Sequence, residues 1–427
     1  MRQMLLTFAL LAATAQAEDG WDDWETGGWE AEAESAFPLY GFAEFGVGSR
    51  LEPSPYHERI SLSDARVRLE TDGQLSSIQY TAKGDLLYDG VLDEWDAQAR
   101  ELSLGFSPRS NLDVKLGRQV MTWGTGDYLF LNDLFAKDWQ AFFIGRDNEY
   151  LKAPQDAVRL SGYFDWANVE LAWTPEFTPD NYLRAERLSL FNPVAGSLIG
   201  EAQAFTALEP DEDELALRVY RNLGSLELAF YGYDGYTKSP MALSEPDAPT
   251  VNPQPTFAPL RVWGASARSP VGTGLINAEV AYHDSTEDSE GNKPGLPNSQ
   301  WRGLLGYERE LMARLTASVQ LYLEHTQNHA ALLAHSPNPE WEPEQNRTLV
   351  TTHLSWRDAR DRLTLSLFGF YSPSDRDGHL RPALDYRFDD HLSLSAGLNL
   401  FFGEEAHTFF GQLEDNQNAY LRMRYSF

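Results

Sequence analysis

Residues 315–324 read LTASVQLYLE, and apolar side chains occupy every second position of this stretch. The positions between them are mostly polar, and the apolar face consists of Leu315, Ala317, Val319, Leu321 and Leu323. Because successive side chains of a β-strand point to opposite faces, this alternation predicts a strand with one apolar and one polar face. About ten residues is the length of a tilted strand that crosses a membrane between lipid and a wet lumen.

The same period of two recurs from Phe37 to the C-terminus, for example in residues 77–89, 392–402 and 418–427. Short turn-rich links alternate with longer links, which lie near 123–156, 177–213, 234–258, 284–299, 326–346 and 403–417. This pattern predicts an all-β fold, a transmembrane antiparallel β-barrel with short periplasmic turns and long acidic extracellular loops. The alternating segments indicate about 18 strands, with 16 as the alternative count.

A soluble β-sandwich or propeller is the other fold that alternating strands allow. No fixed-period repeat supports a propeller, and a sandwich has to bury one face of every strand in a dry core. Here the apolar faces carry aromatic side chains near the predicted strand ends, such as Trp263, Trp301 and Trp356. Aromatic girdles of this kind mark the two interfaces of a membrane barrel.

The composition excludes several classes of protein. The chain of 427 residues contains no cysteine, so disulfides, thiol catalysis and cysteine-ligated metals are excluded. Thirty-four basic against 64 acidic residues give a formal net charge of −30, which opposes binding to nucleic acid because phosphate is repelled. After the first twenty residues, no apolar run reaches the roughly 18–20 residues of a membrane-spanning helix.

The N-terminal 36 residues differ from the rest of the chain. Residues 1–17 combine Arg2, a short apolar core and an Ala-Gln-Ala cleavage site, which predicts a secretory signal peptide. Residues 18–36 hold eight acids, no bases and three Trp. We expect a periplasmic tail there, either a solvated leader or a docking site for a periplasmic partner. The barrel is predicted to span residues 37–427 in the outer membrane of a Gram-negative bacterium.

The last ten residues, NAYLRMRYSF, alternate in the same way and end in Phe427. Leu421, Met423, Tyr425 and Phe427 share one face, and Arg422 and Arg424 share the other. A closing strand that ends in aromatic-x-Phe resembles the C-terminal signature of outer-membrane proteins. That resemblance implies recognition by the barrel-insertion machinery.

The predicted registers turn a mixed set of charged side chains toward the lumen, with acids such as Glu279 and Asp385 among them. The candidate pore-lining bases are Arg66, Arg68, Lys83, Arg118, Arg159, Arg218, Arg261, Arg302, Arg381, Arg422 and Arg424. Charged rings set the selectivity of a pore, and the fork of arginine suits carboxylates, so anionic or polyhydroxylated solutes are expected. Alternatively, these bases and acids pair across strands and only hold the barrel in shape.

Residues 116–156 contain the predicted link that begins near residue 123, and this link is unusually aromatic for a solvated loop, so residues 124–156 are the candidate constriction. Strict alternation turns Arg118 toward lipid, and a bulge at Gly117 would turn it inward. We expect the link to fold into the barrel, pack its apolar side on the wall and narrow the pore. The alternative is a loop over the rim or at a subunit contact. The polar side that would line the path consists of Asp127, Asn132, Asp133, Lys137, Asp138, Arg146 and Asp147.

Gly117-Arg118-Gln119 followed by Trp123-Gly124, on a strand that enters a long loop, resembles a motif of alginate-export-type porins and related outer-membrane barrels. The match covers about ten residues, and the barrel layout agrees loosely. The resemblance implies an 18-stranded barrel that passes a polyanionic or bulky solute along arginine side chains. Of the residues, only Arg118 and its neighbours carry over, and the wall is less basic than a polyuronate exporter requires.

The sequence favours a porin or channel that passes small hydrophilic solutes by passive diffusion, as a monomer or a trimer. No catalytic residue, metal or cofactor is expected, because the nucleophile-elbow, HExxH, EF-hand and phosphate-loop motifs are absent. His353 and Ser355 share a strand face but lack an orienting third group. The alternatives are an export component that works with an inner-membrane transporter, a sheath around a threaded protein, and a barrel hydrolase.

Overall fold

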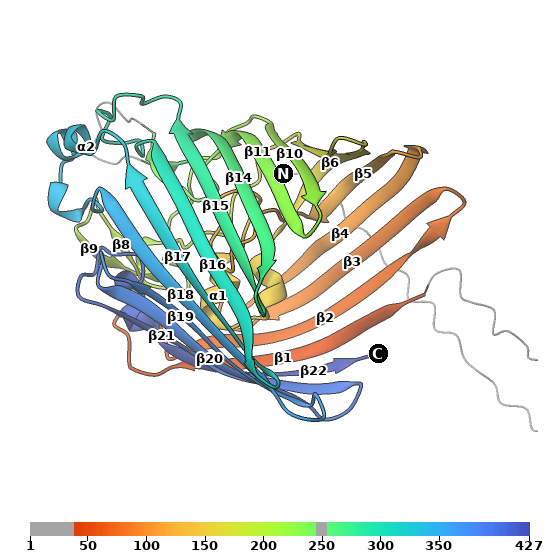
Figure 1. The fold of residues 1–427 in the computed structure, drawn as a ribbon. Coiled ribbons are helices and arrows are strands. Elements are labelled where there is room, and N and C mark those ends of the chain that lie inside the picture. The colour runs from red at the N-terminus through yellow and green to blue at the C-terminus, as the bar shows by residue number, and fades with distance from the viewer. Residues whose placement is uncertain (1–37, 245–253) are drawn as a thin grey trace, which may run out of the picture. The chain divides into compact units, whose positions relative to one another are not determined.

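The computed structural model describes residues 38–244 and 254–427, in which 18 strands form one antiparallel sheet (Figure 1). The predicted signal peptide and acidic segment lie outside the described residues. The sheet closes on itself because β1 pairs with both β2 and β22. The strands are β1 Tyr40–Arg50, β2 Ile60–Leu75, β3 Ile78–Asp89, β4 Glu94–Arg109, β5 Leu112–Val120, β6 Pro154–Tyr163, β7 Asn168–Thr174, β10 Glu214–Leu223, β11 Leu226–Tyr236, β14 Pro259–Val271, β15 Gly274–Ser285, β16 Gln300–Met312, β17 Leu315–Thr326, β18 Asn346–Arg357, β19 Leu363–Ser372, β20 Asp377–Arg387, β21 Leu392–Gly403 and β22 Asn418–Ser426.

The links alternate in length around the barrel, as predicted. At one rim, the turns that follow β2, β4, β10, β14 and β16 consist of two residues each. At the other rim, residues 121–153 join β5 to β6, residues 175–213 join β7 to β10, and residues 327–345 join β17 to β18. Short turns face the periplasm in bacterial barrels, so the long links mark the extracellular side.

The alternation in β17 shows how the sheet divides lipid from lumen. The side chains of Val319 and Leu323 are 51% and 50% exposed, whereas Gln320 between them is 2% exposed. A soluble protein would bury the apolar residues and expose the polar one. The inverted pattern recurs around the barrel, so the structure confirms a membrane barrel of 18 strands and excludes a strand count of 16. Closure satisfies the backbone of every strand, as a bilayer requires, and such barrels belong to the outer membrane.

The remaining elements lie in the links. Two two-stranded ladders pair β8 with β9 and β12 with β13. No helix in the described residues has the length and apolar run needed to cross a membrane. These smaller elements are α1 Trp139–Ile144, α2 His329–His335, the 3-10 helices η1 Asn148–Leu151, η2 Glu201–Gln203, η3 Pro339–Trp341 and η4 Gly411–Asn416, and the strands β8 Leu190–Asn192, β9 Ser197–Ile199, β12 Ala242–Leu243 and β13 Pro255–Thr256.

The main apolar cluster lies inside the barrel. It joins residues of the 121–153 link, including Leu131, Phe142 and Ile144, to inward side chains of many strands. Figure 1 shows α1 within the ring of strands. We call residues 121–153 the inserted segment, since they occupy the lumen that the strands enclose.

Candidate pore constriction and lumen

Helix α1 of the inserted segment is fixed at both ends by its own sequence. The carboxylate of Asp138 caps the helix by accepting a hydrogen bond of 2.7 Å from the backbone N–H of Ala141. Gly145 ends it with a φ of 88°, a left-handed conformation that glycine adopts without strain. Between them, Phe142, Phe143 and their neighbours are buried. The sequence therefore forms one short helix with an aromatic surface that needs a partner.

The lumen wall supplies that partner. The ring of Phe142 lies 6.4 Å from that of Phe370 in β19, and the ring of Phe143 lies 5.6 Å from that of Phe401 in β21. Tyr128 meets the edge of Phe368 at 4.6 Å. Aromatic pairs at these spacings contribute beyond the area that they bury. The apolar side of the inserted segment thus packs on the inner wall, as predicted.

An ionic anchor holds the C-terminal part of the inserted segment to β2 and β3. Arg146 donates to Asp64 at 2.7 Å and to Asp89 at 2.8 Å, and the three side chains are only 6–11% exposed. The guanidinium of Arg66 lies 3.9 Å from the centre of the Tyr150 ring, and Arg68 donates to the Tyr150 hydroxyl at 2.8 Å. Buried charges are stable only when paired and hydrogen-bonded in this way.

A second anchor holds the first part of the inserted segment to the opposite wall. The amide of Asn132 donates to Glu279 in β15 at 2.7 Å, and the backbone N–H of Asp127 donates to Gln320 in β17 at 3.1 Å. Lys137 donates to Asp133 at 3.0 Å. With contacts on both sides, the segment spans the lumen.

Asp180, from the long link after β7, adds two hydrogen bonds to this second anchor. It accepts the backbone N–H of Lys137 at 2.7 Å and the indole N–H of Trp139 at 3.0 Å. Burial raises the pKa of Asp180, and the nearby charge of Lys137 opposes that shift without cancelling it. Two extracellular links are therefore tied together inside the barrel.

These contacts correct part of the predicted path. Asn132, Asp133 and Lys137 are 4%, 4% and 2% exposed, so their side chains are buried anchors and do not line open space. Asp138 caps α1, and Arg146 is paired with Asp64 and Asp89. Asp127 accepts from Ser318 on the wall at 3.3 Å. The sequence predicted that these polar groups lie in the lumen. It did not show that most of them form hydrogen bonds and ion pairs that hold the inserted segment in place.

Most predicted wall bases do face inward. Seven are ion-paired on the inner face: Arg66 and Arg68 with Asp85, Lys83 with Glu70, Arg218 with Glu170, Arg302 with Glu324, and Arg422 and Arg424 with Glu44. Two more, Arg159 and Arg381, lie on the same face of β6 and β20 as buried inward residues and form no ion pair within the described residues. Most of the predicted wall bases therefore pair with acids across strands, as the second of the two expectations has it.

Arg118 and Arg261 are the exceptions, because both point outward. Arg118 pairs with Asp156 at 3.0 Å, and Arg261 pairs with Asp234 at 3.2 Å, all four on the outer face. No register shift occurs at Gly117, although its φ is 108° and a Cβ there would come 2.3 Å from the Leu102 carbonyl oxygen. The predicted bulge is therefore wrong. Both pairs lie two residues from the extracellular strand ends, where a charge costs little.

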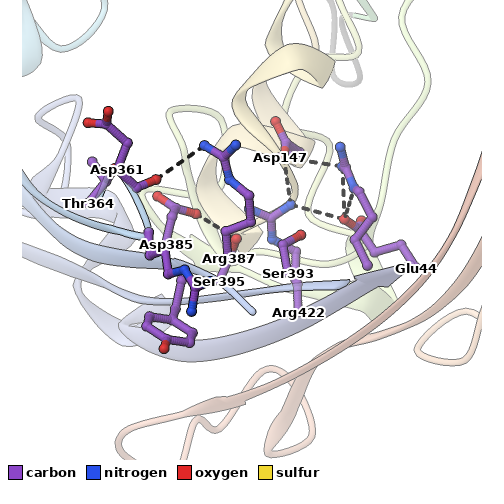
Figure 2. A pocket seen from close by; sticks show the side chains of 12 residues that line it. Glu44, Asp147, Asp361, Thr364, Asp385, Arg387, Ser393, Ser395 and Arg422 are labelled. Carbon is purple, nitrogen blue, oxygen red and sulfur yellow. Dashed lines mark hydrogen bonds and ion pairs between the residues drawn. The ribbon is translucent and has the colours of Figure 1, made fainter. Parts of the chain in front are cut away.

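Below the inserted segment, toward the short turns, lies a cavity of about 200 Å³ that we call the vestibule (Figure 2). Asp147 forms part of it and accepts from Arg422 at 3.0 Å and from Arg424 at 3.2 Å. Burial alone would raise the pKa of Asp147, but the two guanidiniums outweigh it and hold the pKa below the usual value. The vestibule is lined by Glu44, Asp147, Asp361, Arg362, Thr364, Asp385, Tyr386, Arg387, Ser393, Ser395, Arg422 and Arg424.

Several lumen residues were not predicted from the sequence. Tyr150 and Glu149 gave no signal, because their partners Arg66 and Arg68 lie about eighty residues away. Arg100 turns inward beside Tyr150 through a register shift next to Lys83, which a strict period of two does not foresee. Glu44, by comparison, lies on the polar face of residues 40–50, where the alternation itself could have found it.

The pair of His353 and Ser355 does share the inner face of β18, as its alternation predicts. The ring of His353 lies 5.5 Å from that of Phe368. Within the described residues, neither side chain has a hydrogen-bonding partner that would orient it, and the proton relay of a serine hydrolase needs such a partner.

No family model and no curated protein matches the sequence. Among solved structures, the chain is similar to a loop L8 deletion mutant of OmpT, an outer membrane protein of Vibrio cholerae, at 12% identity and a TM-score of 0.44, covering 92% of this chain and 99% of that one. It is also similar to a mutant of the Rh. blastica porin, at 12% identity and a TM-score of 0.42, covering 92% and 100% of the two chains.

Proposed function

We propose that this protein is a passive outer-membrane channel for small hydrophilic solutes and that the inserted segment forms its constriction. The observation that carries the proposal is the position of residues 121–153, which pack on the inner wall at Phe370 and are anchored at Asp64 and Glu279. A segment held on both sides narrows a lumen and fixes its polar groups. This arrangement disfavours a sheath for a threaded protein, which needs a wide free lumen.

The charges of the wall bear on the class of solute. Seven of the predicted inward bases are neutralised by carboxylates, so the expected preference for anions is small. Arg159 keeps a guanidinium without an ion pair in the described part of the chain, and it supports the passage of anionic or polyhydroxylated solutes. Arg381 is also unpaired there, but it is 7% exposed and its guanidinium lies 3.9 Å from the centre of the Phe142 ring, so it packs on the inserted segment instead. Arg118, the residue on which the likeness to alginate-export-type porins rests, lies outside the path. We therefore propose selection mainly by size.

Liposome swelling tests this function directly. Purified protein should let neutral sugars enter in order of their size, with monosaccharides fastest, and should give ohmic currents in planar bilayers. The reversal potential across a salt gradient should show only weak selectivity between anions and cations. Protein that inserts into bilayers but passes neither current nor sugar would overturn the proposal.

Two partners other than solutes are also proposed, the barrel-insertion machinery and a periplasmic protein. Recognition by the barrel-insertion machinery would act on β22, whose end is joined to β1 by backbone hydrogen bonds of 3.0 Å between Phe427 and Gly41. Docking of a periplasmic protein would act on residues 18–36, outside the described residues. Truncation at Phe427 and removal of residues 18–36 test these two proposals separately, by barrel assembly in cells and by capture of periplasmic proteins.

A further inference from the structure

The vestibule has balanced charge but is divided into two unlike halves. Four carboxylates and four guanidiniums line it. In one half, Arg422 and Arg424 are paired with Glu44 and Asp147 at 2.8–3.4 Å, which leaves that half saturated. Figure 2 shows these groups gathered at one side of Arg387, with Asp361 and Asp385 at the other.

In the other half, the charged side chains have no ionic partners among residues 38–244 and 254–427. In the described part of the chain, the side chain of Arg387 donates only to the backbone oxygen of Asp361 at 3.2 Å, and the carboxylate of Asp385 accepts only from the hydroxyl of Ser395 at 2.6 Å. Within the described residues, neither side chain is in an ion pair, and the same holds for Arg362. Asp385 and Arg387 are two positions apart on β20 and share its inner face, so roughly 7 Å separates their Cα atoms.

We propose that this half of the vestibule is a binding subsite for a small zwitterion that bears a carboxylate and an ammonium group, as an α-amino acid does. The carboxylate would take the two donors of the Arg387 guanidinium fork, and the ammonium would lie on Asp385. Ser393 and Thr364 offer hydroxyls to the rest of the molecule. The inference rests on the proposed function, because it names a solute class for the same lumen.

Charge balance and size argue for a zwitterion over a simple ion. A bound anion would neutralise Arg387 and leave Asp385 facing a second negative charge, and a bound cation would do the reverse. A zwitterion satisfies both groups at once. The cavity of about 200 Å³ has room for several water molecules, each of which takes about 30 Å³, and so accepts a molecule the size of serine.

Saturation-transfer NMR on the full protein in detergent micelles tests the subsite without depending on channel current. The probes are L-serine, glycolate, which lacks the ammonium, and ethanolamine, which lacks the carboxylate. We expect L-serine to bind about tenfold or more tightly than either fragment, and Arg387→Gln and Asp385→Asn each to weaken it by about tenfold or more. Arg387→Lys should retain part of the affinity, because it keeps the charge without the fork.

Arg376→Gln is the matched control, since Arg376 pairs with Glu404 at the extracellular rim and should not change the affinity. Equal binding of glycolate and L-serine, or L-serine binding that survives both vestibule substitutions, would overturn the subsite, as would no binding of L-serine to folded protein. Retained heat-modifiable migration on gels shows that each variant is folded. Failure of the channel itself appears separately, as absence of potassium chloride current in bilayers.

Discussion

Two of the long extracellular links carry a short helix, yet only one of them enters the barrel. In the inserted segment, Leu131, Phe142 and Ile144 are at most 2% exposed. In the link 327–345, α2 buries only Leu332, while Leu333 is 37% exposed and the helix lies at the rim (Figure 1). The inserted helix has the sequence WQAFFI and the outer one HAALLAH. Aromatic content and ionic anchors, rather than length, separate a constriction from a surface loop.

Deleting each of the two links in turn should give the largest difference between them. Removal of residues 127–148 should raise single-channel conductance severalfold, because the lumen loses the segment that spans it. Removal of residues 331–344 should leave conductance near that of the intact protein, because α2 lies outside the lumen. Planar-bilayer recording decides between these outcomes. Equal effects of the two deletions would mean that the links do not differ in function.

The ionic anchor predicts a large loss of stability. Arg146→Ala leaves Asp64 buried without its partner, and breaking a buried pair in this way costs about 3–5 kcal/mol. The free energy of unfolding, measured by urea titration of the protein in lipid vesicles, should fall by that amount. Arg376→Ala, which removes an exposed pair at the rim, should leave the unfolding midpoint unchanged. A harmless Arg146→Ala would show that the anchor does not hold the segment.

The hydroxyl of Tyr150 should make a smaller contribution to the same anchor. Tyr150→Phe keeps the ring between Arg66 and Arg100 but removes the hydrogen bond from Arg68. We expect a loss of about 1.5–3 kcal/mol, the typical contribution of a hydrogen bond to a charged group. The same urea titration measures it. A loss as large as that of Arg146→Ala would mean that the hydroxyl, not the ion pairs, dominates.

Acid should weaken the contact of Asp147 with β22. The pKa of Asp147 is lowered in the folded protein, so its contribution is complete above the ordinary aspartate pKa of about 3.9 and is lost as the pH falls through the lower folded value. Conductance should therefore stay constant from pH 8 to about pH 5 and rise below about pH 4. Asp147→Asn should show a raised conductance already at neutral pH. Identical pH profiles for both proteins would contradict this role.

The smallest effect is expected at Arg118. Its pair with Asp156 is exposed on the outer face, and such pairs are worth about 0–1 kcal/mol. Arg118→Gln should leave both conductance and reversal potential unchanged. A clear shift in the reversal potential would indicate that Arg118 borders the solute path, and it would support the resemblance to polyanion exporters.

The sequence predicted the barrel well because a period of two determines which face each strand residue occupies, as for Gln320 and Arg422. It failed at Arg118 and Arg261, because alternation does not show how far along a strand the membrane ends. Both residues lie at the extracellular ends, where an outward charge is tolerated. It also misjudged Asn132 and Lys137. The Asn132 amide and the Lys137 backbone N–H bind Glu279 and Asp180, which come from distant parts of the chain and are brought there only by folding, whereas the Lys137 ammonium pairs with nearby Asp133.

The absence of cysteine from the chain allows the most direct test of the central claim, that the inserted segment borders the solute path. Glu149→Cys places one thiol on the segment, where the native side chain is 38% exposed, and Leu333→Cys places one on α2. A charged methanethiosulfonate reagent added to open channels should lower the current stepwise for Glu149→Cys and leave Leu333→Cys unchanged. Complete labelling at position 149 with no change in current would contradict the account.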